Sequence, residues 1–204
     1  MDTQEYIQQF IYYPHPILKE IDRDNQQRDD IEPNIGLQAA SLIDILLRSI
    51  QAKNVLELGT CIGFSTITLA NVMQSIGGHL TAVEFNPARV LETRANLEKA
   101  GLLEVVTLIQ ADASLALADL TGPFDLILQD SDKLLYPKLF ERCFELLRPG
   151  GILAADDTLF PTMPVPERYK PAINEYNQQV FHHPGLVSTI LPIGDGLTIS
   201  FKNP

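Results

Sequence analysis

Each of two apolar runs, 124–128 and 151–155, is followed closely by carboxylates. These acidic side chains are Asp130, Asp132, Asp156 and Asp157. If the two runs are parallel strands of one sheet, their carboxyl ends meet at the edge where α/β sheets bind ligands. Clustered carboxylate oxygens suit a hard divalent cation, Mg²⁺ first and Mn²⁺ or Ca²⁺ as alternatives. Asp also caps helices often, but Lys133, three residues after Asp130, favours a metal site for the set.

A glycine-rich segment, 57–65, predicts the end of a strand, a tight loop and the start of a helix. Gly59 and Gly63 would let the backbone turn sharply and approach a ligand closely. Glu84 ends the next apolar run and could accept hydrogen bonds from a ribose diol. Two ligands bind in this way, a dinucleotide and S-adenosylmethionine. The Gly-x-x-x-Gly spacing departs from the G-x-G-x-x-G of dinucleotide sites and disfavours a pyrophosphate.

Alternating strands and helices must position these side chains. The strands expected from apolar runs are 55–58, 80–85, 105–109, 124–128, 151–155, 187–191 and 197–201. The helices expected from residue 54 onward are about 65–74, 86–100, 114–120, 136–147 and 171–181. Such repeated βα units predict a parallel sheet with helices on both faces. The short turn Ile193-Gly194-Asp195-Gly196 between the last two strands predicts an antiparallel hairpin.

The N-terminal fifty residues carry a different pattern from the rest. Residues 36–50 have apolar positions at helical spacing, whereas 22–30 is strongly polar and is expected to be a solvated surface. We expect one domain over 1–204, with 1–50 as a helical cover and substrate lid and 54–204 as the core.

Composition limits the protein class further. The chain has 204 residues, 45% of them hydrophobic and 20% charged, and these values suit one globular domain with a sizeable core. The net charge of −11 would repel phosphate backbones, so no nucleic-acid partner is expected. Cys61 and Cys143 are too few for a disulfide framework. The sequence has no signal peptide pattern and no apolar run that could span a membrane, so a cytoplasmic location is expected.

Taken together, these motifs resemble the small cation-dependent class I O-methyltransferases, such as the catechol and caffeoyl-coenzyme A O-methyltransferases. The resemblance covers nearly the whole chain from about residue 31. It rests on the glycine loop, Glu84, the Asp130-Ser131-Asp132-Lys133 segment, Asp156-Asp157-Thr158-Leu159 and the turn 191–197. The resemblance implies a Rossmann-like methyltransferase domain whose seven-stranded sheet is mostly parallel and ends in an antiparallel hairpin.

The resemblance also implies the roles of individual residues. It implies S-adenosylmethionine as the cofactor, held by Ile35, Glu57, Gly59, Gly63, Ser65, Glu84, Asp112, Ala113, Asp130 and Asp132. It implies a divalent cation on Asp130, Asp156 and Asp157, with Lys133 and Asp130 in catalysis. A homodimer is expected because family members commonly form one. Ile35 could equally be core, Ser65 a helix cap, and Lys133 a salt-bridge partner of Asp130 or Asp132.

One position departs from the family pattern, since Asp157 stands where Asn is usual. The extra charge should tighten cation binding and puts the metal preference and the rate in doubt. We expect a small catechol-like acceptor, with residues 10–35 and 158–170 around it, because no long basic patch for coenzyme A phosphates is evident. Alternatives are a caffeoyl-coenzyme A-type acceptor, a modified tRNA uridine, an NAD-dependent oxidoreductase and a non-enzymatic S-adenosylmethionine-binding protein.

Overall fold

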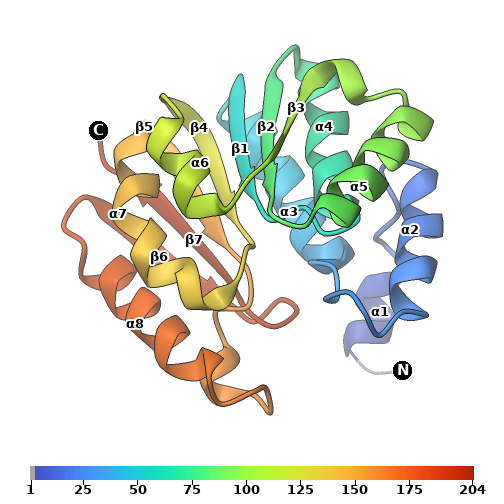
Figure 1. Ribbon diagram of the computed structural model, residues 1–204. Helices are drawn as coiled ribbons and strands as arrows, with labels where there is room; N and C mark the ends of the chain where they lie inside the picture. The colour runs from blue at the N-terminus through green and yellow to red at the C-terminus, as the bar shows by residue number, and fades with distance from the viewer. Residues whose placement is uncertain (1–2) are drawn as a thin grey trace.

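A single seven-stranded sheet forms the centre of the molecule (Figure 1). The computed structural model describes residues 3–204, so the first two residues of the predicted N-terminal cover lie outside the described part. The strands are β1 (Asn54–Leu58), β2 (His79–Glu84), β3 (Val106–Gln110), β4 (Phe124–Gln129), β5 (Leu147–Ala155), β6 (Leu186–Leu191) and β7 (Leu197–Lys202). Their order in the sheet is β3-β2-β1-β4-β5-β7-β6.

The sheet is parallel except at β7. Strand β1 lies between β2 and β4, and β4 pairs with β5, all in parallel. Strand β7 runs antiparallel to both β5 and β6. The mostly parallel sheet and the antiparallel closing hairpin predicted from the sequence are therefore confirmed. Strands β1 and β4 are buried on both faces, and for this reason their sequences are nearly continuous apolar runs.

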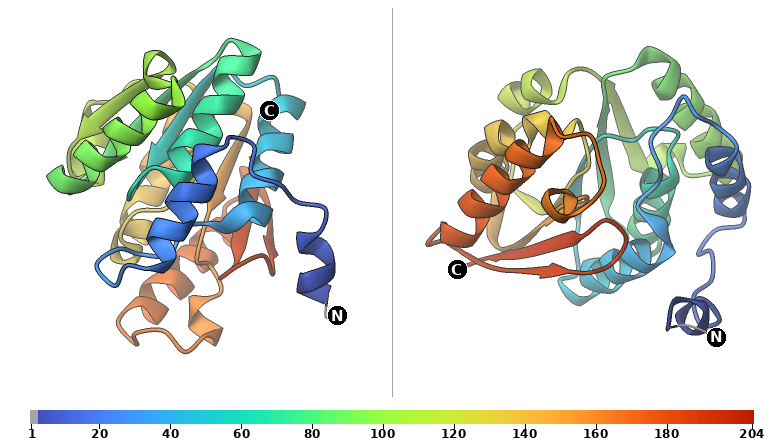
Figure 2. Two further views of the ribbon diagram at one scale, coloured as in Figure 1. Left: turned by 90° about the vertical axis from the view of Figure 1, so that its right-hand side faces the viewer. Right: turned by 90° about the horizontal axis from the view of Figure 1, so that it is seen from below.

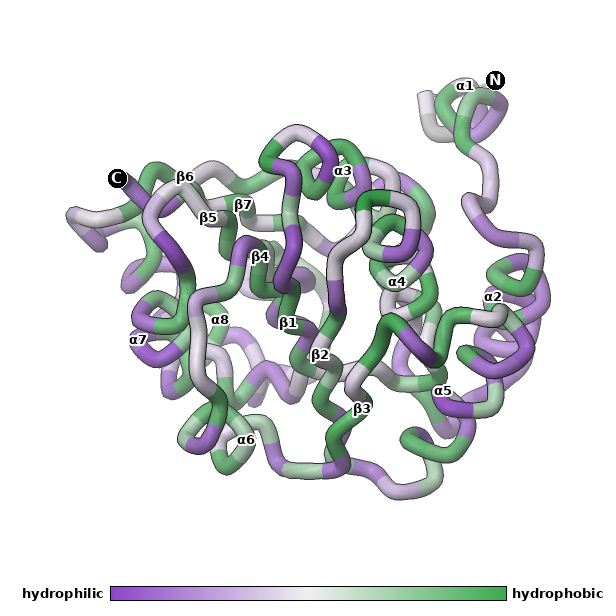
Figure 3. Tube along the Cα trace, turned by 90° about the horizontal axis from the view of Figure 1, so that it is seen from above, coloured by the Kyte–Doolittle hydropathy of each residue, from purple (hydrophilic) through white to green (hydrophobic). Residues whose placement is uncertain are grey.

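Helices cover both faces of the sheet, as predicted. They are α1 (Thr3–Gln8), α2 (Ile17–Gln26), α3 (Gly36–Ser49), α4 (Phe64–Ile76), α5 (Pro87–Ala100), α6 (Ala113–Asp119), α7 (Tyr136–Leu146) and α8 (Tyr169–His182). Helices α3, α4 and α5 lie on one face and α6, α7 and α8 on the other, while α1 stands off from the body (Figures 1 and 2). Apolar residues concentrate along the strands, and polar residues are frequent in the connecting loops (Figure 3). None of the helices among the described residues is long and apolar enough to cross a membrane.

The boundaries of α5 agree with the sequence signals, whereas β5 begins earlier than predicted. Asn86 caps α5 by accepting from Ala88 N at 2.9 Å, and Gly101 ends the helix with φ +68°. The helix predicted over about 136–147 ends at Leu146, in agreement, but the strand predicted over 151–155 already begins at Leu147, so the Pro-Gly-Gly segment 149–151 lies inside β5. The reason is sheet pairing: Leu147 already pairs with Phe124, so the chain is extended before the proline.

Most residues of the polar segment 22–30 are exposed, as predicted, but two side chains anchor the segment to its neighbours. Its first half is the end of α2, where Asn25 is buried and donates to Glu32 O at 2.8 Å. Its second half is tied to α5, because Arg28 Nη1 lies 2.6 Å from Glu92 Oε2. The segment is therefore a largely solvated surface that these two contacts hold in place.

Candidate active site

Three carboxylates meet at the carboxyl ends of β4 and β5. One oxygen from each of Asp130, Asp156 and Asp157 lies within 4.8 Å of the other two. Asp156 is 7% exposed, and its two neighbours are half-buried. The structure therefore brings together three of the four acids singled out in the sequence. The fourth, Asp132, caps the short helix 133–135, because Leu134 N donates to its Oδ1 at 3.0 Å.

The sheet itself fixes the first two of these carboxylates. Asp130 N continues the parallel pairing by donating to Leu58 O at 2.8 Å, and Asp156 N donates to Gln129 O at 3.2 Å. Both side chains thus leave the sheet at the same edge, as expected for the carboxyl ends of adjacent parallel strands.

The third carboxylate is positioned by a left-handed backbone. Asp157 has φ +61°, a region that Asn and Asp enter more readily than other non-glycine residues. The next residue is anchored to the hairpin, because Thr158 N and Thr158 Oγ1 both donate to Gly196 O at 3.0 Å. The β6–β7 hairpin therefore fixes the direction of the Asp157 side chain.

Lys133 lies between two of the carboxylates. Its Nζ is 2.8 Å from Asp130 Oδ1 and 2.8 Å from Asp157 Oδ2. It also donates to the Tyr136 hydroxyl at 3.3 Å, which in turn donates to Gln129 O at 2.8 Å. Burial lowers the pKa of Lys133, but Asp130, Tyr136 and Asp157 outweigh it and hold the pKa well above its usual value. Lys133 therefore carries a proton in this arrangement.

One lysine does not balance three carboxylates. Burial raises the pKa of Asp156 well above its usual range, and the Asp130 and Asp157 charges raise it further. Burial also raises the pKa of Asp130, although Lys133 opposes this. The cluster therefore lacks positive charge, and its all-oxygen donor set fits a hard divalent cation.

Both glycines of the loop between β1 and α4 are needed for contacts within the protein. Gly59 and Gly63 have φ of +93° and +94°. A Cβ on Gly59 would clash with the carbonyl oxygen of Asp130, and one on Gly63 would lie 3.2 Å from Thr93 Cγ2. The sequence predicted that the backbone of this loop approaches another group closely. The structure shows such an approach, and the partners are the neighbouring segments of the protein. Cofactor contact at these glycines stays a prediction.

Glu84 organises the same loop. Its Oε2 accepts hydrogen bonds from Thr60 N and Cys61 N, each at 3.0 Å. Its Oε1 accepts from Asn86 N at 2.8 Å. The carboxylate at the end of β2 thus holds the glycine loop in place, and its predicted contact with a ribose remains to be tested.

Glu57 is a completely buried carboxyl at the start of the glycine loop. Neither of its oxygens has a hydrogen-bond partner among the described residues. Burial raises the pKa of Glu57 to about 8, although the nearby Ser65 and Thr66 side chains oppose this rise. Buried polar atoms without partners are rare and call for an explanation, such as a bound ligand or ion. Contact of Glu57 with the cofactor stays a prediction.

Glu57 should make the unfolding free energy of the protein depend on pH. Its pKa is about 8 in the folded protein and 4.5 ordinarily, so folding takes up a proton between these values. The contribution of Glu57 to the unfolding free energy is therefore fully present below pH 4.5. It is lost as the pH rises from 4.5 through 8, by an amount on the order of a few kcal/mol. We expect Glu57→Gln to flatten the decline of the unfolding temperature between pH 6 and 8.5, as measured without cofactor.

The control for this measurement is Glu141→Gln, on the exposed side of α7, which should leave the pH profile as it is. Equal pH profiles for wild type and Glu57→Gln would contradict the prediction.

The remaining predicted cofactor residues border the same edge of the sheet. Asp112 caps α6 by accepting from Ser114 N at 2.8 Å, and Ala113 is the first residue of that helix. Ser65 is buried at the start of α4, and Ile35 is buried in the core at the start of α3. The structure shows capping and packing for these residues, and their contact with a cofactor stays a prediction.

Sequence reasoning missed two residues beside the acidic cluster. Asp195 belongs to a glycine-rich segment that was interpreted only as a turn, yet burial and then the Asp157 charge raise its pKa. Tyr136 was interpreted only as the start of a helix, yet its hydroxyl contacts Lys133. The spacing of three between Lys133 and Tyr136 was the available signal, since such residues share a helix face.

Comparison with known proteins gives a consistent result. The model of the O-methyltransferase family matches residues 8–203. Tapetum-specific methyltransferase 1 from Arabidopsis thaliana is 30% identical over 96% of this chain and 91% of its own length. Catechol O-methyltransferase from Niastella koreensis is 35% identical over 63% of this chain and 58% of its own. The crystal structure of the O-methyltransferase from Bacillus cereus in complex with SAH has a TM-score of 0.78 and 25% identity, covering 91% of this chain and 90% of that one.

The sheet order and the site geometry define a class I methyltransferase fold, as the sequence resemblance implied. The match over residues 8–203 is more specific. The chain belongs to the O-methyltransferase family.

Proposed function

We propose that this O-methyltransferase transfers the methyl group of S-adenosylmethionine to a hydroxyl of a small catechol-like acceptor and depends on a divalent cation. The observation that carries the proposal is the cluster of three carboxylates with Lys133 at the sheet edge beside the glycine loop. The relative named catechol O-methyltransferase and the homologous complex with SAH support the acceptor class and the cofactor.

The glycine loop and its surroundings would hold the cofactor. Glu57 offers a carboxyl without a partner for an amino group, and Glu84 stands at the end of β2 for a ribose. Ser65 and the start of α4 supply backbone N–H groups at a helix N-terminus. When bound, S-adenosylmethionine would supply an activated methyl group. Its transfer is mainly a problem of positioning the acceptor oxygen.

Asp130, Asp156 and Asp157 would hold the cation, and Asp130 also holds Lys133. When bound, a divalent cation would lower the pKa of an acceptor hydroxyl and take up carboxylate charge that now keeps Lys133 protonated. Lys133 Nζ is the group placed to accept the hydroxyl proton. Tyr136 restrains that Nζ through its hydroxyl and ties it to the end of β4.

A transfer assay tests the proposal directly. The purified protein, labelled S-adenosylmethionine and a panel of catechols would be assayed with Mg²⁺, with a chelator, and with Mg²⁺ restored. We expect methylated catechol with Mg²⁺, little product with the chelator, and recovery on restoring the metal. Turnover that a chelator leaves unchanged would contradict the cation dependence.

Asp157→Asn should keep activity and change metal preference. The left-handed backbone at this position suits Asn as well as Asp. Losing one charge should weaken cation binding by about tenfold or less and also remove one of the two carboxylates that bind Lys133. The measurement is activity against Mg²⁺, Mn²⁺ and Ca²⁺ concentration. A folded but inactive variant would contradict this expectation.

Other activities remain distinguishable. A caffeoyl-coenzyme A-type acceptor is favoured by two further relatives of that name, and the same panel with a hydroxycinnamoyl thioester separates it. The net charge of −11 disfavours a tRNA uridine acceptor.

Nicotinamide binding would indicate an oxidoreductase, and cofactor binding without turnover would indicate a non-enzymatic binding protein. Homodimer formation stays a prediction that a mass measurement in solution tests.

A further inference from the structure

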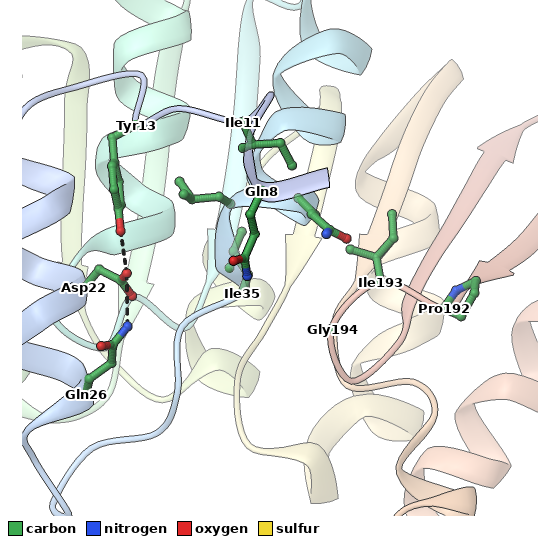
Figure 4. Close-up of a pocket in the computed structure, with 12 residues that line it drawn as sticks. Gln8, Ile11, Tyr13, Asp22, Gln26, Ile35, Pro192, Ile193 and Gly194 are labelled. Atoms are coloured by element: carbon green, nitrogen blue, oxygen red, sulfur yellow. Dashed lines mark hydrogen bonds between the residues drawn. The ribbon is translucent and has the colours of Figure 1, made fainter. Parts of the chain in front are cut away.

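An open cavity of about 600 Å³ lies between the N-terminal cover and the tip of the β6–β7 hairpin (Figure 4). Ile11 and Ile35 border it from the cover, and Ile193 borders it from the hairpin. Gln8, at the end of α1, points toward it in the close-up. This volume is in the range of pockets that bind small organic molecules. It is larger than a lone catechol ring requires.

The polar wall of the cavity is built around Asp22. Its Oδ2 accepts from the Tyr13 hydroxyl at 2.7 Å and from Gln26 Nε2 at 3.2 Å, and its Oδ1 accepts from Asn34 Nδ2 at 2.8 Å. All three donors are neutral. The hydrogen bond to Asp22 is also the main reason that the pKa of Tyr13 is raised to about 12, so Tyr13 keeps its proton.

Asp22 is the only charged side chain among the described residues that line the cavity, and none of them is Lys or Arg. A phosphate or carboxylate placed here would meet the charge of Asp22 with no cation beside it. A cationic group would find both Asp22 oxygens already occupied by the donors of Tyr13, Gln26 and Asn34. The glutamine side chains Gln8 and Gln26 offer both donors and acceptors beside aliphatic surface. This combination suits an uncharged group with several hydroxyls.

The cavity adjoins the acidic cluster through two shared segments. Gly194 at the hairpin tip and Ile35 line the same cavity, and the backbone carbonyl of the next hairpin residue, Asp195, accepts from Leu159 N at 2.9 Å, two residues after Asp157. On the other side, the carbonyl oxygen of Glu32 lies 4.0 Å from Cys61 Sγ in the glycine loop, so residues 32–36 run between that loop and the cavity. A substituent on an acceptor ring held at the carboxylates would extend over these segments into the cavity.

On the basis of the proposed function, we infer that the acceptor is a catechol carrying an uncharged, hydroxyl-rich substituent, such as a glycosyl group, which binds in the cavity beside Asp22 and Gln8. The same cavity selects against acceptors with anionic tails, including coenzyme A thioesters. Because the substituent binds away from the reacting atoms, it should change KM more than kcat.

Four acceptors that share one catechol ring test the inference, with Mg²⁺ and S-adenosylmethionine present. They carry a methyl group, a glycosyl group, a carboxyethyl group and an aminoethyl group. We expect the glycoside to have a KM about fivefold below that of methylcatechol, and the carboxyethyl compound a KM above it. A KM for the aminoethyl compound below that of the glycoside would overturn the inference that the substituent is uncharged.

Two variants assign the effect to the cavity. Gln8→Lys, on an exposed helix end, should raise the ratio of kcat/KM for the carboxyethyl catechol to kcat/KM for methylcatechol about fivefold over the wild-type ratio. Asp22→Asn should also lower the KM for the carboxyethyl compound. The matched control is Asp24→Asn, on the same helix but outside the cavity, where Asp24 pairs with Arg28 at 3.3 Å.

Failure of the inference and failure of the proposed function give different results. If methylcatechol is not methylated at all, the proposed function fails. If methylcatechol is methylated but all four substituents give the same KM in wild type and in Gln8→Lys, only the inference is overturned. Faster methylation of a hydroxycinnamoyl-coenzyme A than of every small catechol would also overturn it.

Discussion

Asp156→Asn is expected to remove methyl transfer almost completely, with a fall in kcat/KM of about 1000-fold, or about 4 kcal/mol of transition-state stabilisation. Asp156 is buried, and its pKa is raised well above the usual range by burial and by Asp130 and Asp157. The raised pKa favours the protonated carboxyl when no cation is bound. A neutral amide of the same shape should leave the metal-free fold intact while it removes a carboxylate ligand.

Thermal unfolding with and without Mg²⁺ separates loss of the ligand from loss of the fold. Wild type should gain stability with Mg²⁺ by mass action, whereas Asp156→Asn should unfold at the wild-type metal-free temperature and gain little. Asp119→Asn, at the exposed end of α6, serves as the control and should match wild type in both measurements. Retained activity in Asp156→Asn would exclude Asp156 as a required ligand.

Much of the fold could be predicted because its signals are local. The cap at Asn86 and the glycine at 101 define α5 by backbone chemistry that needs no tertiary contact. The start of β5 could not be located in the same way. The strand begins at Leu147 and not at 151 because Leu147 pairs with Phe124, a long-range contact that the Pro-Gly-Gly segment 149–151 does not reveal.

The acidic cluster was predictable for a topological reason, and its neighbours were not. Adjacent parallel strands bring Asp130 and Asp156 to one edge in any sheet of this order. The N-terminal cavity depends instead on how α1, α2 and the hairpin pack together. The polarity of Asp22 suggested solvent, whereas the structure surrounds it with neutral donors from Tyr13, Gln26 and Asn34.

Lys133→Met should reduce kcat by about 100-fold to 10,000-fold, the range for loss of a general base, and should also change metal binding. Lys133 neutralises Asp130 and Asp157 at 2.8 Å each. Removing it leaves these carboxylates without a cation and should lower the metal-free unfolding free energy by about 3 kcal/mol. A cation bound by Asp130 and Asp157 would neutralise the same carboxylates that Lys133 pairs with in the metal-free protein.

Mg²⁺ should therefore stabilise Lys133→Met more than it stabilises wild type, even though the variant is nearly inactive. A purely structural salt bridge predicts the loss of stability but not the loss of kcat once Mg²⁺ has restored the fold. Unfolding temperatures across a Mg²⁺ titration, with kcat measured at saturating Mg²⁺, distinguish these cases. Lys138→Met, exposed on α7, controls for the loss of a lysine. If Lys133→Met recovers wild-type kcat at saturating Mg²⁺, Lys133 is not the proton acceptor and its role is to neutralise the carboxylates in the metal-free protein.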